Sequence, residues 1–146
     1  MPPDDSPTAG LTLLGRPTNH SEDTGLEVFP APANVTSVTF TGKELTARCP
    51  VTGQPDFYSL VLTYHPIRSC VESKSLKLYL TRFRDQEAFC EGLAALVLGD
   101  VVAATRCGPA SVVLRQQVRG GLELTARADH EGGADVEPSP EPEAGA

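Results

Sequence analysis

The segment CPVTGQPD at positions 49–56 places a cysteine and an aspartate at the two ends of one turn-rich stretch. A proline follows Cys49 and another precedes Asp56, and prolines so placed favour a surface turn between two strands. A buried, inert thiol is the alternative, since free cysteine is among the most buried residue types. A thiol held near a carboxylic acid pairs a nucleophile with a proton donor. The sequence therefore predicts that Cys49 and Asp56 act together on an electrophile whose developing charge must be protonated.

A second polar segment, VESKSLKLYL at 71–80, stands at the start of a stretch with helical spacing. Glu72, Ser73 and Lys74 fall where the backbone N–H groups and the dipole of the expected helix favour an anion. Lys77 adds positive charge one turn later. The alternative is a solvated helix start with a serine cap.

A third candidate is Arg119, which precedes Gly120 and Gly121 on an expected hairpin turn. The guanidinium of Arg119 and the glycine backbone beside it could bind a phosphate. The alternative is that these residues only form the turn. Other motifs are missing: the sequence has no G-x-G-x-x-G, no P-loop and no C-x-x-C, and its three histidines are scattered. We therefore expect no conventional dinucleotide fold and no metal site.

The formal charge of −7 is concentrated at the two ends of the chain. Residues 29–128 carry eleven basic and eight acidic side chains, so the central part is mildly basic. This balance suits a small anionic ligand such as a phosphorylated cofactor, and the acidic ends argue against a nucleic-acid binder. The alternative for the acidic ends is that they only keep the protein soluble.

The length of 146 residues is that of one ordinary domain. The opening MPPDDSPTAG lacks the basic start of a signal peptide, and no run approaches the roughly 20 apolar residues that span a bilayer. We expect a cytoplasmic protein with no membrane partner and with four reduced cysteines. Low-complexity composition predicts disorder for residues 1–18 and 131–146, which leaves one domain at 19–130.

Two strands are expected in the first half of the domain. VTSVTFTGKELTARC at 35–49 predicts a strand with a turn or bulge at Thr41-Gly42, and FYSLVLTYH at 57–65 predicts a second. Helical spacing begins at Ser73 and begins again beyond Asp85, which indicates two consecutive helices.

The second half ends in an expected hairpin. Gly108-Pro109 is expected to stop the second helix, after which residues 111–118 and 122–128 flank Gly120-Gly121 as two strands. The order ββααββ indicates an α+β fold with both helices on one face of an antiparallel sheet. Such a sheet leaves two exposed edges, so self-association is a structural expectation.

Taken together, CPVTGQPDF, VESKSLKLYL, AFCEG and VRGG resemble the single-domain form of the NADPH-dependent 7-cyano-7-deazaguanine reductases, the nitrile reductases of queuosine biosynthesis. The resemblance covers residues 35–128, and ESKSLKLY is a specific signature. It implies the tunnelling fold (T-fold), a ββααββ unit that forms homo-oligomeric rings or stacked rings with active sites between subunits. It also implies NADPH as cofactor, 7-cyano-7-deazaguanine as substrate, and no binding of the transfer RNA that is modified later.

The resemblance also implies site residues. Cys49 corresponds to the nucleophile that adds to the nitrile carbon as a thioimidate, and Asp56 to the acid that protonates the nitrogen. The substrate-binding positions are Val71, Glu72, Ser73, Cys90 and Glu91. The cofactor-binding positions are Ser73, Lys74, Arg119 and Gly120.

The chain departs from the family pattern at Cys90, where a histidine usually precedes the substrate-binding glutamate. Cysteine is shorter and a weaker donor, so a polar contact to the substrate is lost or replaced by water. A reversible Cys49–Cys90 disulfide is one hypothesis, and a small pocket-wall residue is the alternative. Two other functions stay open: an amidinotransferase that uses the same thioimidate, and a T-fold protein that binds a purine or pterin without turnover.

Overall fold

The computed structural model describes residues 24–132, and the tail expected at 1–18 lies outside these residues. Of the second expected tail, only residues 131 and 132 are described. No helix in the described range is long and apolar enough to cross a membrane.

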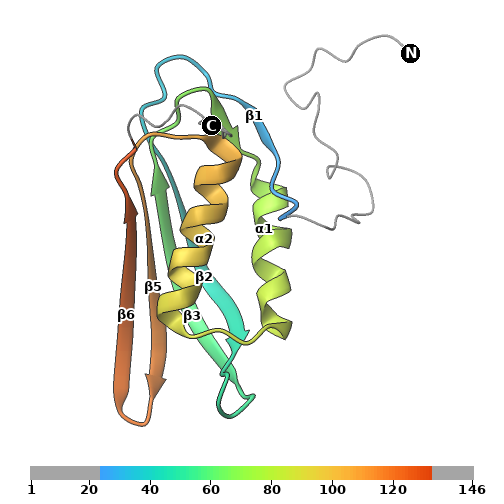
Figure 1. Cartoon of the computed structure of the whole chain (residues 1–146), viewed down its shortest axis with the longest axis vertical. Helices are drawn as coiled ribbons and strands as arrows, with labels where there is room; N and C mark the ends of the chain where they lie inside the picture. Colours follow the sequence, from blue (N-terminus) through green and yellow to red (C-terminus); the bar gives the residue numbers. More distant parts are fainter. Residues whose placement is uncertain (1–23, 133–146) are drawn as a thin grey trace, which may run out of the picture.

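A four-stranded antiparallel sheet forms the main layer of the structure (Figure 1). Its order is β2-β3-β5-β6, with bounds β2 Val38–Arg48, β3 Pro55–Tyr64, β5 Ala110–Arg119 and β6 Leu122–His130. The bulge expected at Thr41-Gly42 is confirmed as a register shift between Gly42 and Leu45. The second strand begins at Pro55 and not at Phe57, since Pro55 already pairs with Arg48. Asp56 therefore lies within the sheet and not in the turn before it.

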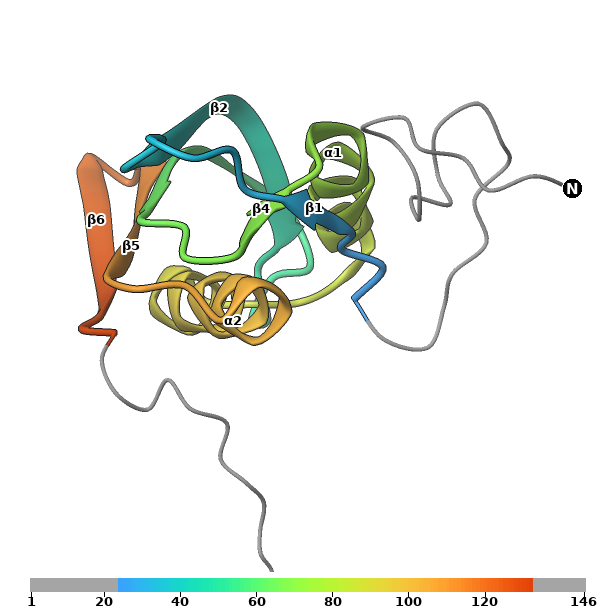
Figure 2. The same ribbon diagram turned by 90° about the horizontal axis from the view of Figure 1, so that it is seen from above.

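Both helices lie on one side of this curved sheet (Figure 2). They are α1 (Ser73–Thr81) and α2 (Cys90–Thr105), joined through the 3-10 helix η1 (Arg82–Asp85). α2 packs against β5 and β6, and η1 against β2. The expectation that Gly108-Pro109 stops the second helix was wrong by a few residues, because Arg106 adopts a left-handed conformation with φ 53° and ends the helix first.

The sequence did not predict a small second sheet. It pairs β1 (Val28–Pro30) with β4 (Ser69–Val71), and the N–H of Glu72 donates to the carbonyl of Glu27 at 2.8 Å beside it. Strands of three residues are too short to show an alternating pattern. This sheet fixes the backbone immediately before α1.

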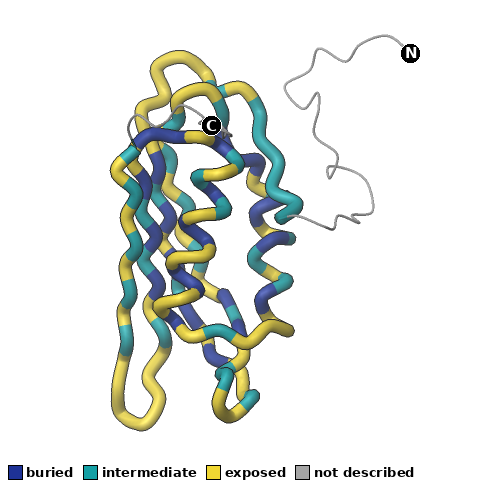
Figure 3. The backbone as a smooth tube through the Cα atoms, viewed as in Figure 1, coloured by how far each residue is buried: buried dark blue, intermediate teal, exposed yellow. Residues whose placement is uncertain are grey.

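The core lies between the sheet and the helices, as the alternating burial along the strands shows (Figure 3). On β3 every second side chain faces inward and is buried: Asp56, Tyr58, Leu60, Leu62 and Tyr64. Side chains of a strand alternate between its two faces, so the residues in between face outward. One acid therefore shares a face with the largest apolar side chains.

The core position Leu62 tests this alternation. Leu62→Ala is expected to lower the free energy of unfolding by about 3 kcal/mol, since the fully buried side chain leaves a cavity. Val61→Ala, one residue earlier and 39% exposed, is expected to cost less than about 1 kcal/mol. Urea denaturation followed by circular dichroism gives both values, and equal losses would contradict the assigned faces.

Candidate active site

The turn between β2 and β3 is closed by its own backbone. The N–H of Cys49 donates to the carbonyl of Gln54 at 2.8 Å, and the N–H of Gly53 donates to the carbonyl of Cys49 at 2.8 Å. Gly53 has φ 74°, a conformation that favours glycine. The two bonds fix the start and end of the turn, so Cys49 and Asp56 keep a constant relation to each other.

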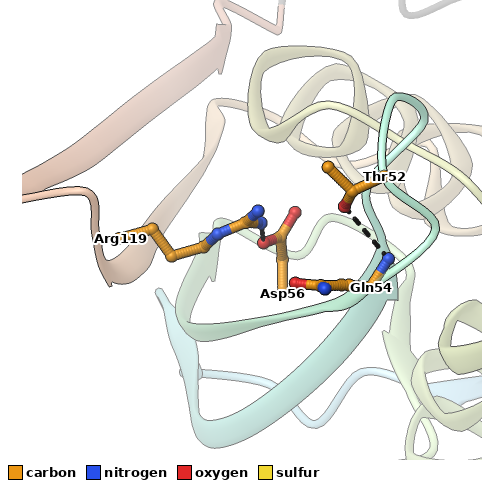
Figure 4. A network of polar contacts seen from close by, with 4 residues as sticks. All are labelled: Thr52, Gln54, Asp56 and Arg119. Carbon is orange, nitrogen blue, oxygen red and sulfur yellow. Dashed lines mark hydrogen bonds and ion pairs between the residues drawn. The ribbon is translucent and has the colours of Figure 1, made fainter.

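Hydrogen-bond donors around the Cys49 thiol favour its charged form. The Thr52 hydroxyl makes the largest contribution, followed by backbone N–H groups of Thr52 and Val51, and together with Arg119 they lower the pKa of Cys49 below its ordinary value. The Thr52 oxygen accepts a hydrogen bond from the N–H of Gln54 at 3.1 Å, so its own hydrogen is free to point at the sulfur (Figure 4). The thiol is half-buried and stays reachable. This combination is that of a reactive cysteine.

Asp56 is paired with Arg119, which reaches it from the end of β5 (Figure 4). The Arg119 Nη1 donates to Asp56 Oδ1, and this contact with the carboxylate is the main reason why the pKa of Arg119 is raised. The same guanidinium also contacts Cys49 as a hydrogen-bond partner. Arg119 therefore joins the acid and the thiol, a contact between distant parts of the chain that the sequence did not predict.

The start of α2 lies beside the same turn. The N–H of Arg48 donates to the carbonyl of Gln86 at 2.8 Å, and the N–H of Ala88 donates to the carbonyl of Arg48 at 3.0 Å. These bonds bring Cys90 and Glu91, the first two residues of α2, to the Cys49 end of the sheet.

Cys90 differs from Cys49 although both are thiols of one site. It is 1% exposed, and its sulfur donates weakly to the carbonyl of Leu114 at 3.8 Å. Burial and, next, the charge of Glu91 raise the pKa of Cys90 to about 11. Cys90 is therefore neutral under conditions in which Cys49 ionises. Both thiols are free in the structure, so the proposed disulfide stays a prediction.

Gly120 follows Arg119 at this end of the sheet, whereas Val71–Lys74, where β4 leads into α1, lie toward the other end (Figure 1). The N–H of Val71 donates to the Tyr64 hydroxyl at 2.8 Å, and Tyr64 ends β3 whereas Asp56 begins it. Eight residues of extended strand separate these two positions by about 26 Å. Within one chain the structure therefore does not bring Val71, Glu72, Ser73 and Lys74 to Cys49.

The start of α1 also differs from the sequence-based expectation. The carboxylate of Glu72 accepts from the N–H of Lys74 at 2.8 Å and from the N–H of Ser75 at 2.7 Å. Two N–H groups that were expected to be free for an anion are therefore already bonded. The cap is Glu72 and not a serine, and an anion at this end must be held by side chains such as Lys74.

A groove of about 350 Å³ runs between β2 and α1. Ser73 and Lys77 line it together with apolar residues of the sheet, and neither Cys49 nor Asp56 does. The described residues contain no group of three or more His, Cys, Asp or Glu side chains able to hold a metal ion.

Sequence reasoning missed two residues of this site, Thr52 and Tyr58. Thr52 lies inside the CPVTGQPD turn, but only the folded turn brings its hydroxyl close enough to the Cys49 sulfur to lower the pKa of the thiol. Tyr58 lies on the same face of β3 as Asp56 and is 0% exposed. The period-two spacing from Asp56 was the signal that could have found it.

The fold and the site together define a T-fold protein with a nucleophilic thiol beside a carboxylic acid. A solved structure described as the archaeosine synthase QueF-Like in the apo form superimposes with a TM-score of 0.59, at 23% identity over 71% of this chain and 98% of that one. This likeness confirms the α+β tunnelling fold that the sequence predicted.

The family model for QueF-like proteins matches residues 55–134. A protein from Halorhodospira halophila is 45% identical over 109 residues, which cover 73% of this chain and 92% of its own. A protein from Syntrophus aciditrophicus is 43% identical over 131 residues, which cover 88% of this chain and 91% of its own. Both are named NADPH-dependent 7-cyano-7-deazaguanine reductase. The chain belongs to the QueF-like protein family.

The reactivity of the Cys49 thiol tests whether the Thr52 hydroxyl lowers its pKa. Thr52→Val removes the hydroxyl that contributes most to the lowered pKa, so the pKa of Cys49 is expected to rise. Because the thiolate is the reactive form, alkylation by iodoacetamide at neutral pH is expected to slow, and its pH midpoint to shift upward. Peptide mass mapping across the neutral and alkaline range measures both.

Thr52→Ser is the matched control, because it keeps the hydroxyl and is expected to keep the wild-type profile. An unchanged profile in Thr52→Val would show that the hydroxyl does not act on the sulfur.

Proposed function

We propose that this protein is an NADPH-dependent reductase that converts the nitrile of 7-cyano-7-deazaguanine into the aminomethyl group of 7-aminomethyl-7-deazaguanine. The names of its relatives support the reaction and the cofactor. The observation that carries the proposal is the Cys49 thiol, whose pKa is lowered by its own turn beside the paired Asp56. The product belongs to queuosine synthesis for transfer RNA, and the enzyme acts on the free base in the cytoplasm without binding RNA.

Cys49 supplies the nucleophile in the proposed mechanism. The proton of the Cys49 thiol passes to Asp56, the resulting thiolate adds to the nitrile carbon, one π bond of the C≡N group opens, and Asp56 delivers that proton to the nitrogen. The result is a covalent thioimidate, whose C=N bond is a better hydride acceptor than the nitrile. The closed turn holds nucleophile and acid on either side of one small group, which lowers the entropic part of the barrier.

NADPH supplies the hydride when it is bound. Lys74 is partly exposed at the start of α1, and the backbone at Gly120 has open space where a side chain would be, so both fit a phosphorylated ligand. Arg119 uses Nη1 for Asp56 and also contacts Cys49, and a guanidinium with five N–H donors has further donors for a phosphate. The proposed cofactor positions Ser73 and Lys74 lie toward one end of the folded sheet, and the positions Arg119 and Gly120 lie at the other.

The separation of these two groups supports an active site built from two subunits. Cys49, Asp56, Cys90, Glu91 and Arg119 gather at one end of the sheet. Val71–Lys74 lie toward the other end, where Val71 contacts Tyr64, and about 26 Å of β3 separates Tyr64 from Asp56. A small substrate does not span that distance, so a second copy must supply the missing half. We propose a homo-oligomeric ring or stacked rings, in which the free edges of the sheet, β2 and β6, pair with neighbours.

The reductase proposal is tested by mixing the protein with the cyano substrate and NADPH and following NADPH absorbance. Wild type is expected to oxidise NADPH, and without NADPH to gain the mass of the substrate at Cys49. Cys49→Ala is expected to lose both signals. Asp56→Asn keeps the thiol and is expected to lower turnover by about 10²- to 10⁴-fold, since proton delivery is lost.

A wild-type protein that neither forms the adduct nor oxidises NADPH would refute the proposal. An adduct that forms but is resolved only by ammonia would instead support the amidinotransferase reading.

The shared site is tested by mixing two inactive variants. Cys49→Ala lacks the nucleophile at one end, and Lys74→Glu reverses a cofactor contact at the other, so each alone is expected to be inactive. Co-expressed subunits that assort at random are expected to restore activity in about one quarter of the sites, because those sites combine two intact halves. No recovery in assembled mixed oligomers would place the whole site within one chain.

A further inference from the structure

Tyr58 carries the one fully buried side-chain polar atom among the described residues that has no hydrogen-bond partner. The residue is 0% exposed and lies two positions after Asp56 on the inward face of β3. A buried hydroxyl without a partner destabilises the folded state and is rare in native proteins. Its presence in this position therefore needs a reason other than stability.

The two other tyrosines of the chain show what a buried phenol ordinarily does in this fold. The hydroxyl of Tyr64 accepts from the N–H of Val71 at 2.8 Å, and that of Tyr79 donates to Asp100 at 2.6 Å. Both residues are as buried as Tyr58, with exposed fractions of 0% and 3%. Of the three, only the tyrosine beside the candidate active site lacks a partner.

The Tyr58 hydroxyl lies among the groups of that site. Burial raises its pKa most, and the negative charge of Asp56 raises it further. The phenol is therefore neutral at physiological pH and has a hydrogen to donate. The two carboxylates around it, those of Asp56 and Glu91, can accept hydrogen bonds when ionised but cannot donate them.

A substrate would have to reach this hydroxyl from the side of Asp56, because Tyr58 itself is 0% exposed. Asp56 is itself 4% exposed and is held by Arg119, so a molecule that takes a proton from Asp56 must first displace the arginine. Asp56 and Tyr58 point to the same side of one strand about 7 Å apart. A movement of Arg119 that uncovers the acid would therefore also open the way toward the tyrosine next to it.

We propose that Tyr58 is a specificity-determining residue of this site, whose hydroxyl donates a hydrogen bond to an acceptor atom on the substrate's heterocycle. The inference rests on the proposed function. A purine-like base presents N–H donors, which suit Glu91, and also a carbonyl oxygen and a ring nitrogen, which need a donor. Tyr58 supplies that donor from the buried side of the site. A site that bonds such an atom rejects analogues that lack it.

The test uses Tyr58→Phe, which removes only the hydroxyl, in the intact oligomer. In a Cys49→Ala background, which prevents the covalent step, Tyr58→Phe is expected to raise the Kd for 7-cyano-7-deazaguanine about tenfold in calorimetry. Without ligand it is expected to raise Tm by about 2 to 4 °C, because a buried unpaired hydroxyl is removed. With Cys49 present, KM for the cyano substrate is expected to rise and KM for NADPH to stay unchanged.

Tyr79→Phe is the matched control, since its hydroxyl is bonded to Asp100 away from this site. It is expected to lower Tm and to leave the Kd for the cyano base unchanged. A Kd that is unaffected by Tyr58→Phe, or weaker binding together with a lower Tm, would overturn the inference and leave the reductase proposal intact. If the Cys49→Ala protein does not bind the cyano base and wild type forms no adduct, both proposals fail.

Discussion

Two backbone hydrogen bonds at Arg48 decide where the parts of this site meet. Arg48 ends β2, and the bonds join it to the carbonyl of Gln86 and the N–H of Ala88 at 2.8 and 3.0 Å. They tie the segment before α2 to the last residue of the strand that leads into Cys49. Because backbone groups make these bonds, side-chain substitutions at the three positions leave them largely intact. The start of α2, with Cys90 and Glu91, therefore stays beside the nucleophilic turn.

The site shows how local surroundings give one residue type two opposite properties. Cys49 lies at the surface among donors from its own turn, so its pKa is lowered. Cys90 lies in the core beside Glu91, so its pKa is raised to about 11. Donors stabilise a thiolate, whereas burial and a neighbouring negative charge destabilise it. Of this pair, Cys49 is therefore the thiol that ionises more readily, and Cys90 stays neutral in the core.

The long axis of the sheet explains why one chain holds half of the proposed site at each end. β3 and β5 run the full length of the molecule, and the turns that carry Cys49 and Arg119 lie at the same end because the strands are antiparallel. The β1–β4 sheet and the Glu72 cap hold Val71–Lys74 at the other end. A site built from two copies would combine the Cys49 end of one chain with the Val71–Lys74 end of another, which is the arrangement proposed above.

The sequence by itself predicted features of single segments. These are a thiol and an acid at the two ends of CPVTGQPD, the bulge at Gly42, the two helices and the hairpin at Gly120-Gly121. These features depend on local spacing and turn residues, which a sequence displays directly. Only the tertiary structure decided that Arg119 joins Asp56, that Glu72 occupies the N–H groups of α1, and that Tyr58 has no partner. Such contacts depend on strand register and on packing between distant residues, and no local pattern encodes them.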